Sequence, residues 1–171
     1  MKTQNIIIFV VILVLIIAGI SFLSKGELSP NTAVTNTESA QTAPNFSLED
    51  LSGNTITLAD YKGVKSVVLD FWATWCPNCQ RDMPRLNSYY EKYKDQVEVI
   101  GVNLQENKNL VEKFVQQKGL TFPIVLDPTG LVSRNYSVRY TNYHVVIDKE
   151  GNVVRTIPGD ISESDIQSLI N

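Results

Sequence analysis

Residues 67–79 read VVLDFWATWCPNC, and they hold the only two cysteines of the chain, Cys76 and Cys79. The first six of these residues form an apolar run broken by one acid, which is typical of a central strand covered on both faces. A helix is predicted over 77–94, because proline suits the first helical position, where a missing N–H costs nothing. The C-x-x-C pair is therefore expected where a buried strand passes into a helix.

This position favours redox chemistry at the cysteines. Cys76 would lie at the helix N-terminus, where unpaired N–H groups and the helix dipole favour a negative charge. The thiolate is the form of cysteine that attacks a disulfide. Cys79 lies one turn further along and can resolve the mixed disulfide that Cys76 forms. We therefore predict dithiol–disulfide exchange that needs no cofactor.

Two other interpretations of the cysteine pair, a structural disulfide and a metal site, have less support from the sequence. A structural disulfide here would close a loop of only about four residues, and the stabilisation from a disulfide grows with loop length. Structural zinc takes four ligands, whereas the chain has two cysteines and one histidine, His144, which is expected to pack within a strand. We therefore expect no metal site.

Outside this segment, short strands alternate with helices. The turns at 50–54 (DLSGN) and 148–152 (DKEGN) predict two hairpins. A strand–helix alternation followed by a hairpin and a last helix predicts an α/β domain with a mixed sheet. The remaining predicted strands are 45–48, 55–58, 97–103, 122–126, 143–147 and 153–157, and the remaining predicted helices are 110–118, 131–136 and 162–170.

The N-terminal residues predict a membrane anchor. Residues 6–23 carry no charge, and a helix of about 18 residues spans about 27 Å, close to the hydrocarbon thickness of a bilayer. The run is long for a signal peptide and is followed by a poor small-x-small site, so an uncleaved anchor is favoured over a cleaved signal. A buried core helix would usually carry a polar face. The predicted order is a cytoplasmic N-terminus (1–5), a transmembrane signal-anchor (6–23), a flexible linker (24–43) and a globular domain (44–171).

The charged residues only weakly indicate the orientation in the membrane, and they argue against nucleic acid as a partner. Lys2 precedes the apolar run, while Lys25 is followed by Glu27, so the positive-inside rule gives a small bias toward an N-terminus inside the cell. The net charge is −3 and the body of the chain has no basic cluster, which argues against binding to nucleic acid. We expect a single-pass monomer with its domain on the extracytoplasmic face of the cell membrane.

The cysteine segment resembles a known active site. FWATWCPNC followed by Pro84 resembles that of the thioredoxin superfamily, over a region from about residue 44 to the C-terminus. The anchor, the linker, the leading hairpin and the inserted segment 103–122 resemble the TlpA/ResA-like branch. This resemblance implies a thioredoxin-like fold with an N-terminal β-hairpin extension and an inserted βα segment. It also implies an extracytoplasmic reductase of oxidised client proteins, apocytochrome c among the candidates, which a membrane thiol–disulfide donor re-reduces.

The resemblance also assigns roles to two acids. Asp70 matches a buried acid that exchanges protons with the inner cysteine; the alternative is an acid at a strand end that reaches water. Glu106 matches a glutamate that raises the pKa of the cysteines and assists proton transfer; the alternative is a solvated loop residue. Negative charge near a thiolate destabilises it, and the residues between the cysteines supply no cation. We therefore predict a reducing protein.

One position departs from the family pattern. The superfamily has a cis-proline opposite the dithiol, and this chain has Asn142 there, preceded by Thr141. A cis bond before a non-proline residue costs about 2.5–4 kcal/mol, so we expect a trans bond. Trp75, Pro77, Thr141 and Asn142 are the predicted client-binding residues. Two alternatives stay open: a disulfide oxidant or isomerase on this scaffold, and a low-activity thiol- or metal-binding module, because Asn142 replaces the proline.

Overall fold

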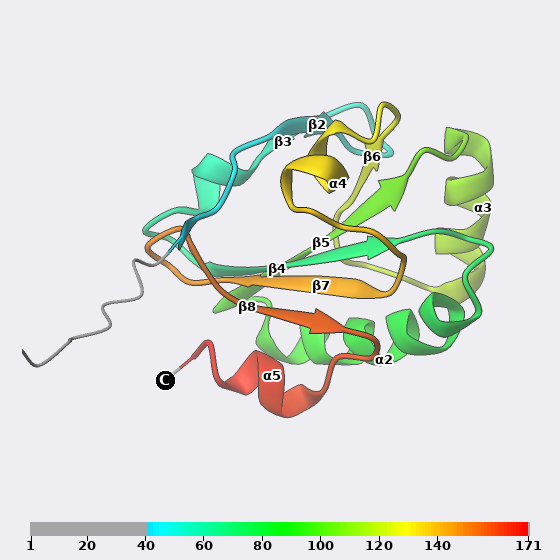
Figure 1. Ribbon diagram of the computed structural model, residues 1–171. Helices are drawn as coiled ribbons and strands as arrows, with labels where there is room; N and C mark the ends of the chain where they lie inside the picture. The colour runs from blue at the N-terminus through cyan, green and yellow to red at the C-terminus, as the bar shows by residue number, and fades with distance from the viewer. Residues whose placement is uncertain (1–40, 171) are drawn as a thin grey trace, which may run out of the picture. The chain divides into compact units, whose positions relative to one another are not determined.

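A mixed six-stranded sheet forms the frame of the domain. In the computed structural model, which describes residues 41–170, the strand order is β1-β8-β7-β4-β5-β6 (Figure 1). Strands β4, β5 and β6 are parallel, while β7 is antiparallel to β4, and β8 is antiparallel to both β7 and β1. The strands are β1 (Gln41–Thr42), β4 (Ser66–Trp72), β5 (Val97–Leu104), β6 (Ile124–Asp127), β7 (Tyr143–Ile147) and β8 (Asn152–Pro158).

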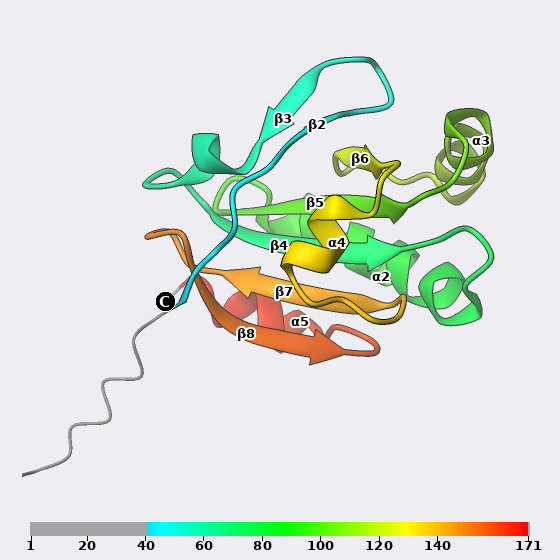
Figure 2. The ribbon, with the colours of Figure 1, turned by 45° about the horizontal axis from the view of Figure 1, so that its top comes forward.

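Two layers cover the sheet. One face packs against α2 (Pro77–Tyr93), α3 (Lys108–Lys118) and α5 (Glu163–Gln167). The other face packs against the hairpin of β2 (Ser47–Glu49) and β3 (Thr55–Thr57), the short helix η1 (Leu58–Tyr61) and α4 (Leu131–Asn135), as Figures 1 and 2 show. Burial on both faces explains why the sequence of β4 is almost continuously apolar.

The side chains of β4 alternate between the two layers. Val68 and Trp72 belong to the core under α2, whereas Leu69 and Phe71 belong to the core under the hairpin and α4. Successive side chains of a strand point to opposite faces, so Asp70 lies on the α2 side with Val68 and Trp72. This alternation places the one acid of the strand beneath the helix that carries the cysteines.

The predicted mixed sheet is confirmed, and two short elements were not predicted. Strand β1 lies inside the segment assigned to the linker and pairs with β8 through Gln41 and Val153. Helix η1 follows β3 directly. The predicted transmembrane segment 6–23 and the rest of the linker lie outside the described residues. Between residues 41 and 170, no helix is long and apolar enough to cross a membrane.

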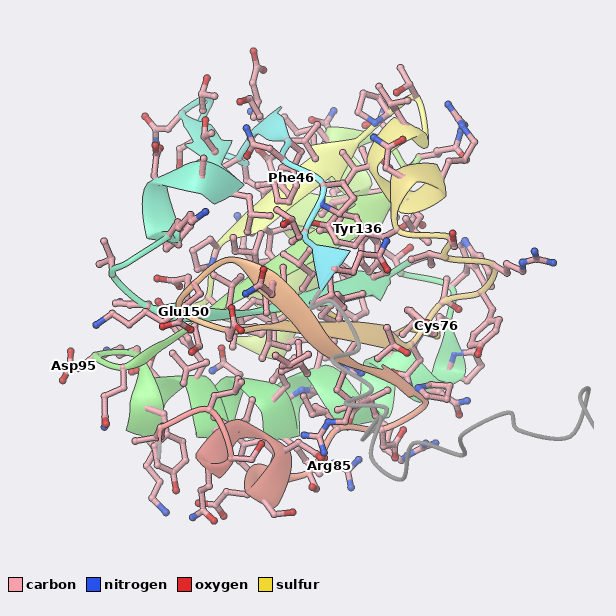
Figure 3. All side chains as sticks on the ribbon, turned by 60° about the vertical axis from the view of Figure 1, so that its left-hand side comes forward. Phe46, Cys76, Arg85, Asp95, Tyr136 and Glu150 are labelled. Carbon is pink, nitrogen blue, oxygen red and sulfur yellow. A yellow bond between two sulfur atoms is a disulfide. The ribbon has the colours of Figure 1, made fainter. Side chains whose placement is uncertain are left out.

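The parallel strands decide where the site lies. The C-terminal ends of β4 and β5 meet at one edge of the sheet, and α2 begins at that edge with Cys76 as its N-cap residue. Figure 3 shows Cys76 at the opposite end of the domain from Asp95 and Glu150. The loops that follow β4 and β5 therefore have to build any site around the cysteines.

Candidate active site

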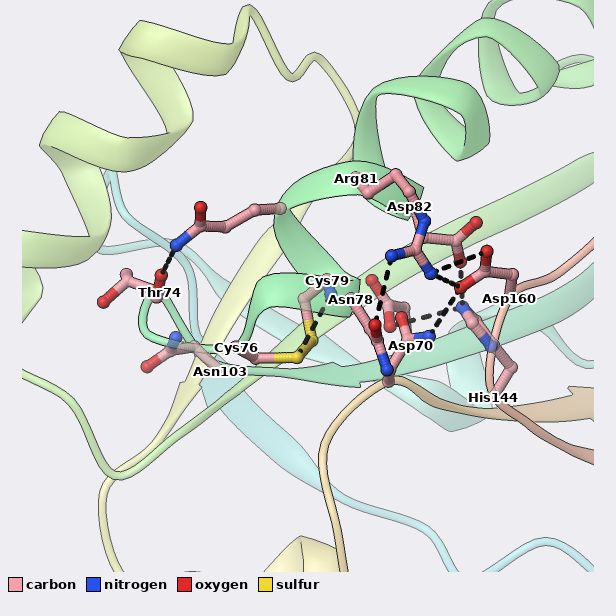
Figure 4. Close-up of a disulfide and its surroundings, with 12 residues drawn as sticks. Asp70, Thr74, Cys76, Asn78, Cys79, Arg81, Asp82, Asn103, His144 and Asp160 are labelled. Carbon is pink, nitrogen blue, oxygen red and sulfur yellow. Dashed lines mark hydrogen bonds and ion pairs between the residues drawn. A yellow bond between two sulfur atoms is a disulfide. The ribbon is translucent and has the colours of Figure 1, made fainter.

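The two cysteines form a disulfide at the start of α2. Their Cα atoms are 5.3 Å apart, and the Cys76 Sγ accepts a hydrogen bond from the Cys79 N–H at 3.1 Å (Figure 4). Cys76 is 4% exposed and is flanked by the exposed residues Trp75 and Pro77, whereas Cys79 is fully buried. Cys76, at the helix N-terminus, is therefore the more exposed of the two cysteines.

Asp70 is buried beneath α2. Its side chain is 1% exposed, and its Oδ1 lies 3.4 Å from His144 Nε2. Burial raises the pKa of Asp70 to about 6; His144 acts to lower this pKa and Asp82 to raise it. The alternative of a strand-end acid that reaches water is therefore wrong. A buried carboxyl group that titrates near neutral pH is suited to take up and release a proton.

Glu106 fixes the loop that precedes Cys76. Its carboxylate accepts hydrogen bonds from the Thr74 N–H at 2.7 Å, the Thr74 hydroxyl at 2.6 Å and the Asn103 side-chain amide at 2.7 Å. Glu106 therefore ties the end of β5 to the turn two residues before Cys76, and it is not a freely solvated loop residue. A role in proton transfer stays a prediction.

Asn142 stands where the family pattern has a proline. Every peptide bond in residues 41–170 is trans, Thr141–Asn142 included, and Asn142 adopts a left-handed conformation with φ of 59°. Its N–H donates to the Phe71 carbonyl at 2.9 Å, and its carbonyl accepts from the Gly159 N–H at 2.8 Å. Its buried side-chain amide donates to Asp160 at 3.0 Å. The loop is thus anchored through Asn142, whose backbone groups are already occupied, while Thr141 is half-buried.

Substituting Asn142 separates backbone strain from the lost hydrogen bond. Both Asn142→Ala and Asn142→Gly lose the bond to Asp160, but only alanine carries a Cβ into the left-handed region, which costs about 1–2 kcal/mol. We expect both variants to be less stable than the wild type, and the alanine variant to be the weaker by about 1 kcal/mol. Urea unfolding of the three proteins measures this order. A glycine variant less stable than the alanine variant would contradict it.

A second buried acid, Asp82, was not predicted. It lies on α2 and is 1% exposed; its Oδ1 accepts a hydrogen bond from Arg85 at 2.7 Å, and its Oδ2 lies 3.5 Å from His144 Nε2. The sequence did contain a hint, because residues three apart share one side of a helix and Asp82 follows Cys79 by three. His144 is buried in a strand, as predicted, and Figure 4 shows it near Asp70 and Asp82.

The basic side chains near the cysteine turn are paired with an acid. Arg81 donates to the Asn78 side chain at 3.1 Å and to Asp160 at 2.9 Å, and Arg85 also contacts Asp160 at 2.7 Å. In the part of the chain that the structure describes, no group of three His, Cys, Asp or Glu side chains is arranged to hold a metal ion. Asp70 and Asp82 both approach the same nitrogen of His144, Nε2.

The comparisons with known proteins agree with this geometry. Residues 40–156 match the AhpC/TSA family. The thiol-disulfide oxidoreductase ResA of Geobacillus kaustophilus is 40% identical over 168 residues, which are 97% of this chain and 94% of that protein. ResA of Bacillus subtilis is 41% identical over 130 residues, which are 75% of this chain and 72% of that protein.

Solved structures show the same fold. StoA from Bacillus subtilis matches with a TM-score of 0.66 and 28% identity, over 75% of this chain and 98% of that chain. A thioredoxin family thiol:disulfide interchange protein from Chlorobium tepidum matches with a TM-score of 0.69 and 25% identity, over 77% of this chain and 94% of that chain. The chain therefore belongs to the AhpC/TSA family, and it is a thioredoxin-like thiol-disulfide oxidoreductase related to ResA, with a C-x-x-C active site.

Proposed function

We propose that this protein is a membrane-anchored reductant of disulfides in proteins outside the cytoplasm. The observation that carries the proposal is the buried carboxyl group of Asp70 beneath the helix that holds Cys79. Negative charge near a thiolate raises its energy, so the disulfide form is favoured and the dithiol becomes the stronger reductant. Glu106, fixed beside the cysteine turn, acts in the same direction, and the positive charge of Arg81 is paired with Asp160.

The proposed reaction moves two electrons to the client. The Cys76 thiolate attacks one sulfur of the client disulfide, and the other client sulfur leaves as a thiolate that takes a proton from water. Cys79 gives its proton to Asp70, and its thiolate then attacks the Cys76 sulfur. The mixed disulfide breaks, the second client sulfur leaves, and the protein keeps the Cys76–Cys79 disulfide. A thiol–disulfide donor in the membrane must return two electrons, which restore the Cys76 thiolate and the Cys79 thiol, and the proton held on Asp70 returns to Cys79.

The surface around Cys76 is suited to bind an unfolded client segment. Trp75 is 67% exposed next to Cys76, and Tyr140 is 53% exposed in the loop that leads to Thr141. Trp75, Pro77 and Thr141 are the proposed contacts, and Asn142 supports the loop from behind through its bonds to Phe71 and Gly159. Exposed aromatic side chains beside a reactive sulfur supply apolar contact without demanding one sequence.

The reduction potential of the Cys76–Cys79 pair tests the direction of electron flow. The domain is equilibrated with dithiothreitol or glutathione buffers, and the reduced fraction is counted by thiol alkylation. We expect a value at or below that of thioredoxin, about −270 mV. A value near about −120 mV, as in strong oxidants, would overturn the proposal and make the protein a disulfide oxidant.

A matched pair of glutamate variants tests the cause. Glu106→Gln removes a charge beside the cysteine turn, and we expect the potential to become less negative by about 10–30 mV, since 30 mV is about a tenfold change in the equilibrium constant. Glu112→Gln removes a charge on α3 that pairs with Lys108, and it should leave the potential unchanged. Equal potentials for wild type and Glu106→Gln would remove Glu106 from the explanation.

The family resemblance favours apocytochrome c as the client. Its haem attachment sequence is C-x-x-C-H, so an oxidised peptide with this sequence is the appropriate probe. We expect the reduced domain to reduce this peptide faster than an oxidised peptide of the same composition with the cysteines further apart. Equal rates would leave a general disulfide reductase and remove the preference for cytochrome c.

A further inference from the structure

Three buried ionisable side chains meet under the cysteine helix. His144 on β7 lies directly opposite Asp70 on β4 in the sheet register. Its Nε2 is 3.4 Å from Asp70 Oδ1 and 3.5 Å from Asp82 Oδ2, and all three side chains are 1% exposed. These residues come from two strands and a helix, so the fold creates a cluster that is scattered in the sequence.

The three side chains differ in how many hydrogen-bond partners they have. Asp82 accepts hydrogen bonds from Arg85 and from the Ile161 N–H, at 2.7 and 3.2 Å. Both oxygens of Asp70 and both nitrogens of His144 lack a hydrogen-bond partner of good geometry. A buried carboxylate without a partner is costly, so an ionised Asp70 has to draw its stabilisation from the nearby imidazole.

The cluster lies behind the resolving cysteine. Cys79 and Asp82 are three residues apart on the buried side of α2, and residues at this spacing are neighbours on a helix surface. Asp70 lies on the face of β4 that packs against this side of the helix, with Val68 and Trp72. Figure 4 shows Asp70, Asp82 and His144 gathered on one side of the disulfide.

We propose that His144 is a positioning residue for proton transfer: its imidazole, held between the two carboxylates, favours the ionised form of Asp70, which is then ready to accept the Cys79 proton. Asp82 acts in the opposite sense, since a second negative charge favours a neutral Asp70. The proton leaves Cys79 Sγ and binds an Asp70 oxygen, while His144 holds the Asp70 carboxyl group in place. The proton returns to Cys79 when the disulfide is reduced again. This proposal rests on the assignment of Asp70 as the proton acceptor in the proposed function.

The charges around the cluster support this division of roles. Arg85 neutralises Asp82 from its outer side and also contacts Asp160. On α5, the pKa of Asp165 is lowered despite burial, by hydrogen bonds from Ser162 and by the charges of Arg155 and His144. The charged groups around His144 and Asp70 are therefore Asp82 from α2, which both of them sense, and Asp165 from α5, which senses His144. Arg85 on α2 and Asp160 in the loop after β8 are linked to the cluster through Asp82, and the cysteines lie at the start of α2.

The test follows the resolving step against pH. The reduced domain reacts with 5,5′-dithiobis(2-nitrobenzoate): the first coloured thiolate reports attack by Cys76, and the second reports displacement by Cys79. The rate of the second phase is measured from pH 4 to 10 for wild type, Asp70→Asn, His144→Asn and Asp82→Asn. Glu98→Gln, which removes a buried acid that pairs with Lys65 at the other end of β5, is the control and should keep the wild-type profile.

The two neighbouring variants should shift the profile in opposite directions. In His144→Asn the midpoint should move up by about one pH unit, so the second phase is about tenfold slower on the acid side of the profile and recovers at high pH. In Asp82→Asn the midpoint of the pH profile should move to lower pH, because a negative charge that favours neutral Asp70 is removed. General damage to the fold would slow both variants without opposite shifts. If His144→Asn does not fold, His144→Gln and the downward shift of Asp82→Asn still provide the test.

The outcomes separate this inference from the proposed function. If the rate of the second phase in Asp70→Asn depends on pH as in the wild type, Asp70 is not the proton acceptor, and that part of the proposed function fails. If Asp70→Asn loses this pH dependence while His144→Asn and Asp82→Asn shift together or not at all, the role of His144 is overturned and the role of Asp70 stands. Loss of the pH dependence in Asp70→Asn with opposite shifts in the other two supports both.

Discussion

A Cys79→Ser variant is expected to stop after the first half of the reaction and to accumulate as a covalent adduct with its client. Cys76 can still attack, but serine cannot displace the client sulfur under these conditions, because its hydroxyl is a far weaker nucleophile than a thiolate. Turnover should fall by at least about 10³-fold, as expected when a nucleophile is removed. Non-reducing electrophoresis with the oxidised client, followed by mass spectrometry, detects the adduct.

The matched control is Cys76→Ser. This variant keeps Cys79, which is fully buried in the described domain, so it should form little adduct and also lack turnover. The asymmetry between the variants tests the assignment of Cys76 as the attacking sulfur and Cys79 as the resolving one. Equal amounts of adduct from both variants would show that either sulfur can attack the client, and the assigned order would be wrong.

Local patterns explain why the cysteine segment and most elements were predicted correctly. An apolar strand, a proline at the first helical position and the cysteine spacing lie within one short stretch, so β4 and the start of α2 follow from neighbouring residues. The hairpin of β7 and β8 likewise follows from its turn residues. The two-residue strand β1 has no such pattern and exists because β8 offers it a pairing edge.

The sequence did not predict which single side chains lie next to each other where distant segments of the chain meet. His144 was expected to pack within a strand, and it does, but its position opposite Asp70 follows from the pairing of β4 with β7. Asp70 and His144 lie far apart in the sequence. The sequence does not reveal which residues of two such strands face each other, because register depends on the whole sheet. Asp82 was overlooked although its spacing of three from Cys79 on the helix is a local pattern.

Asn142 shows the limit of inference from a family pattern. The absence of the proline left a low-activity binding module open as an alternative, but asparagine accepts the left-handed conformation better than most residues. Its three hydrogen bonds then hold the loop to β4 and to the segment after β8. A residue that breaks a pattern can thus be accommodated by a different local conformation, which the pattern alone does not predict.

An Asp70→Asn variant of the oxidised protein is expected to be more stable than the wild type at neutral pH. Burial raises the pKa of Asp70 from 3.8 to about 6 in the folded state. Between these two values the folded protein binds a proton that the unfolded chain has already lost, so the stability of the wild type falls as pH rises through this window. Above about pH 6 the full cost remains, about 3 kcal/mol, since one pKa unit corresponds to about 1.4 kcal/mol.

Urea unfolding at a series of pH values from about 3.5 to about 8 measures the difference in the free energy of unfolding between the two proteins. The variant should gain its advantage between about pH 4 and pH 6 and keep it above, while the two curves converge at the acid end, where Asp70 is protonated in both states. Glu98→Gln, which breaks the pair with Lys65, should show no such gain. Parallel curves for wild type and Asp70→Asn would mean that Asp70 does not titrate in this window. A gain in stability together with slower displacement by Cys79 would show that the chain retains a buried acid at a cost because the proton-transfer step requires it.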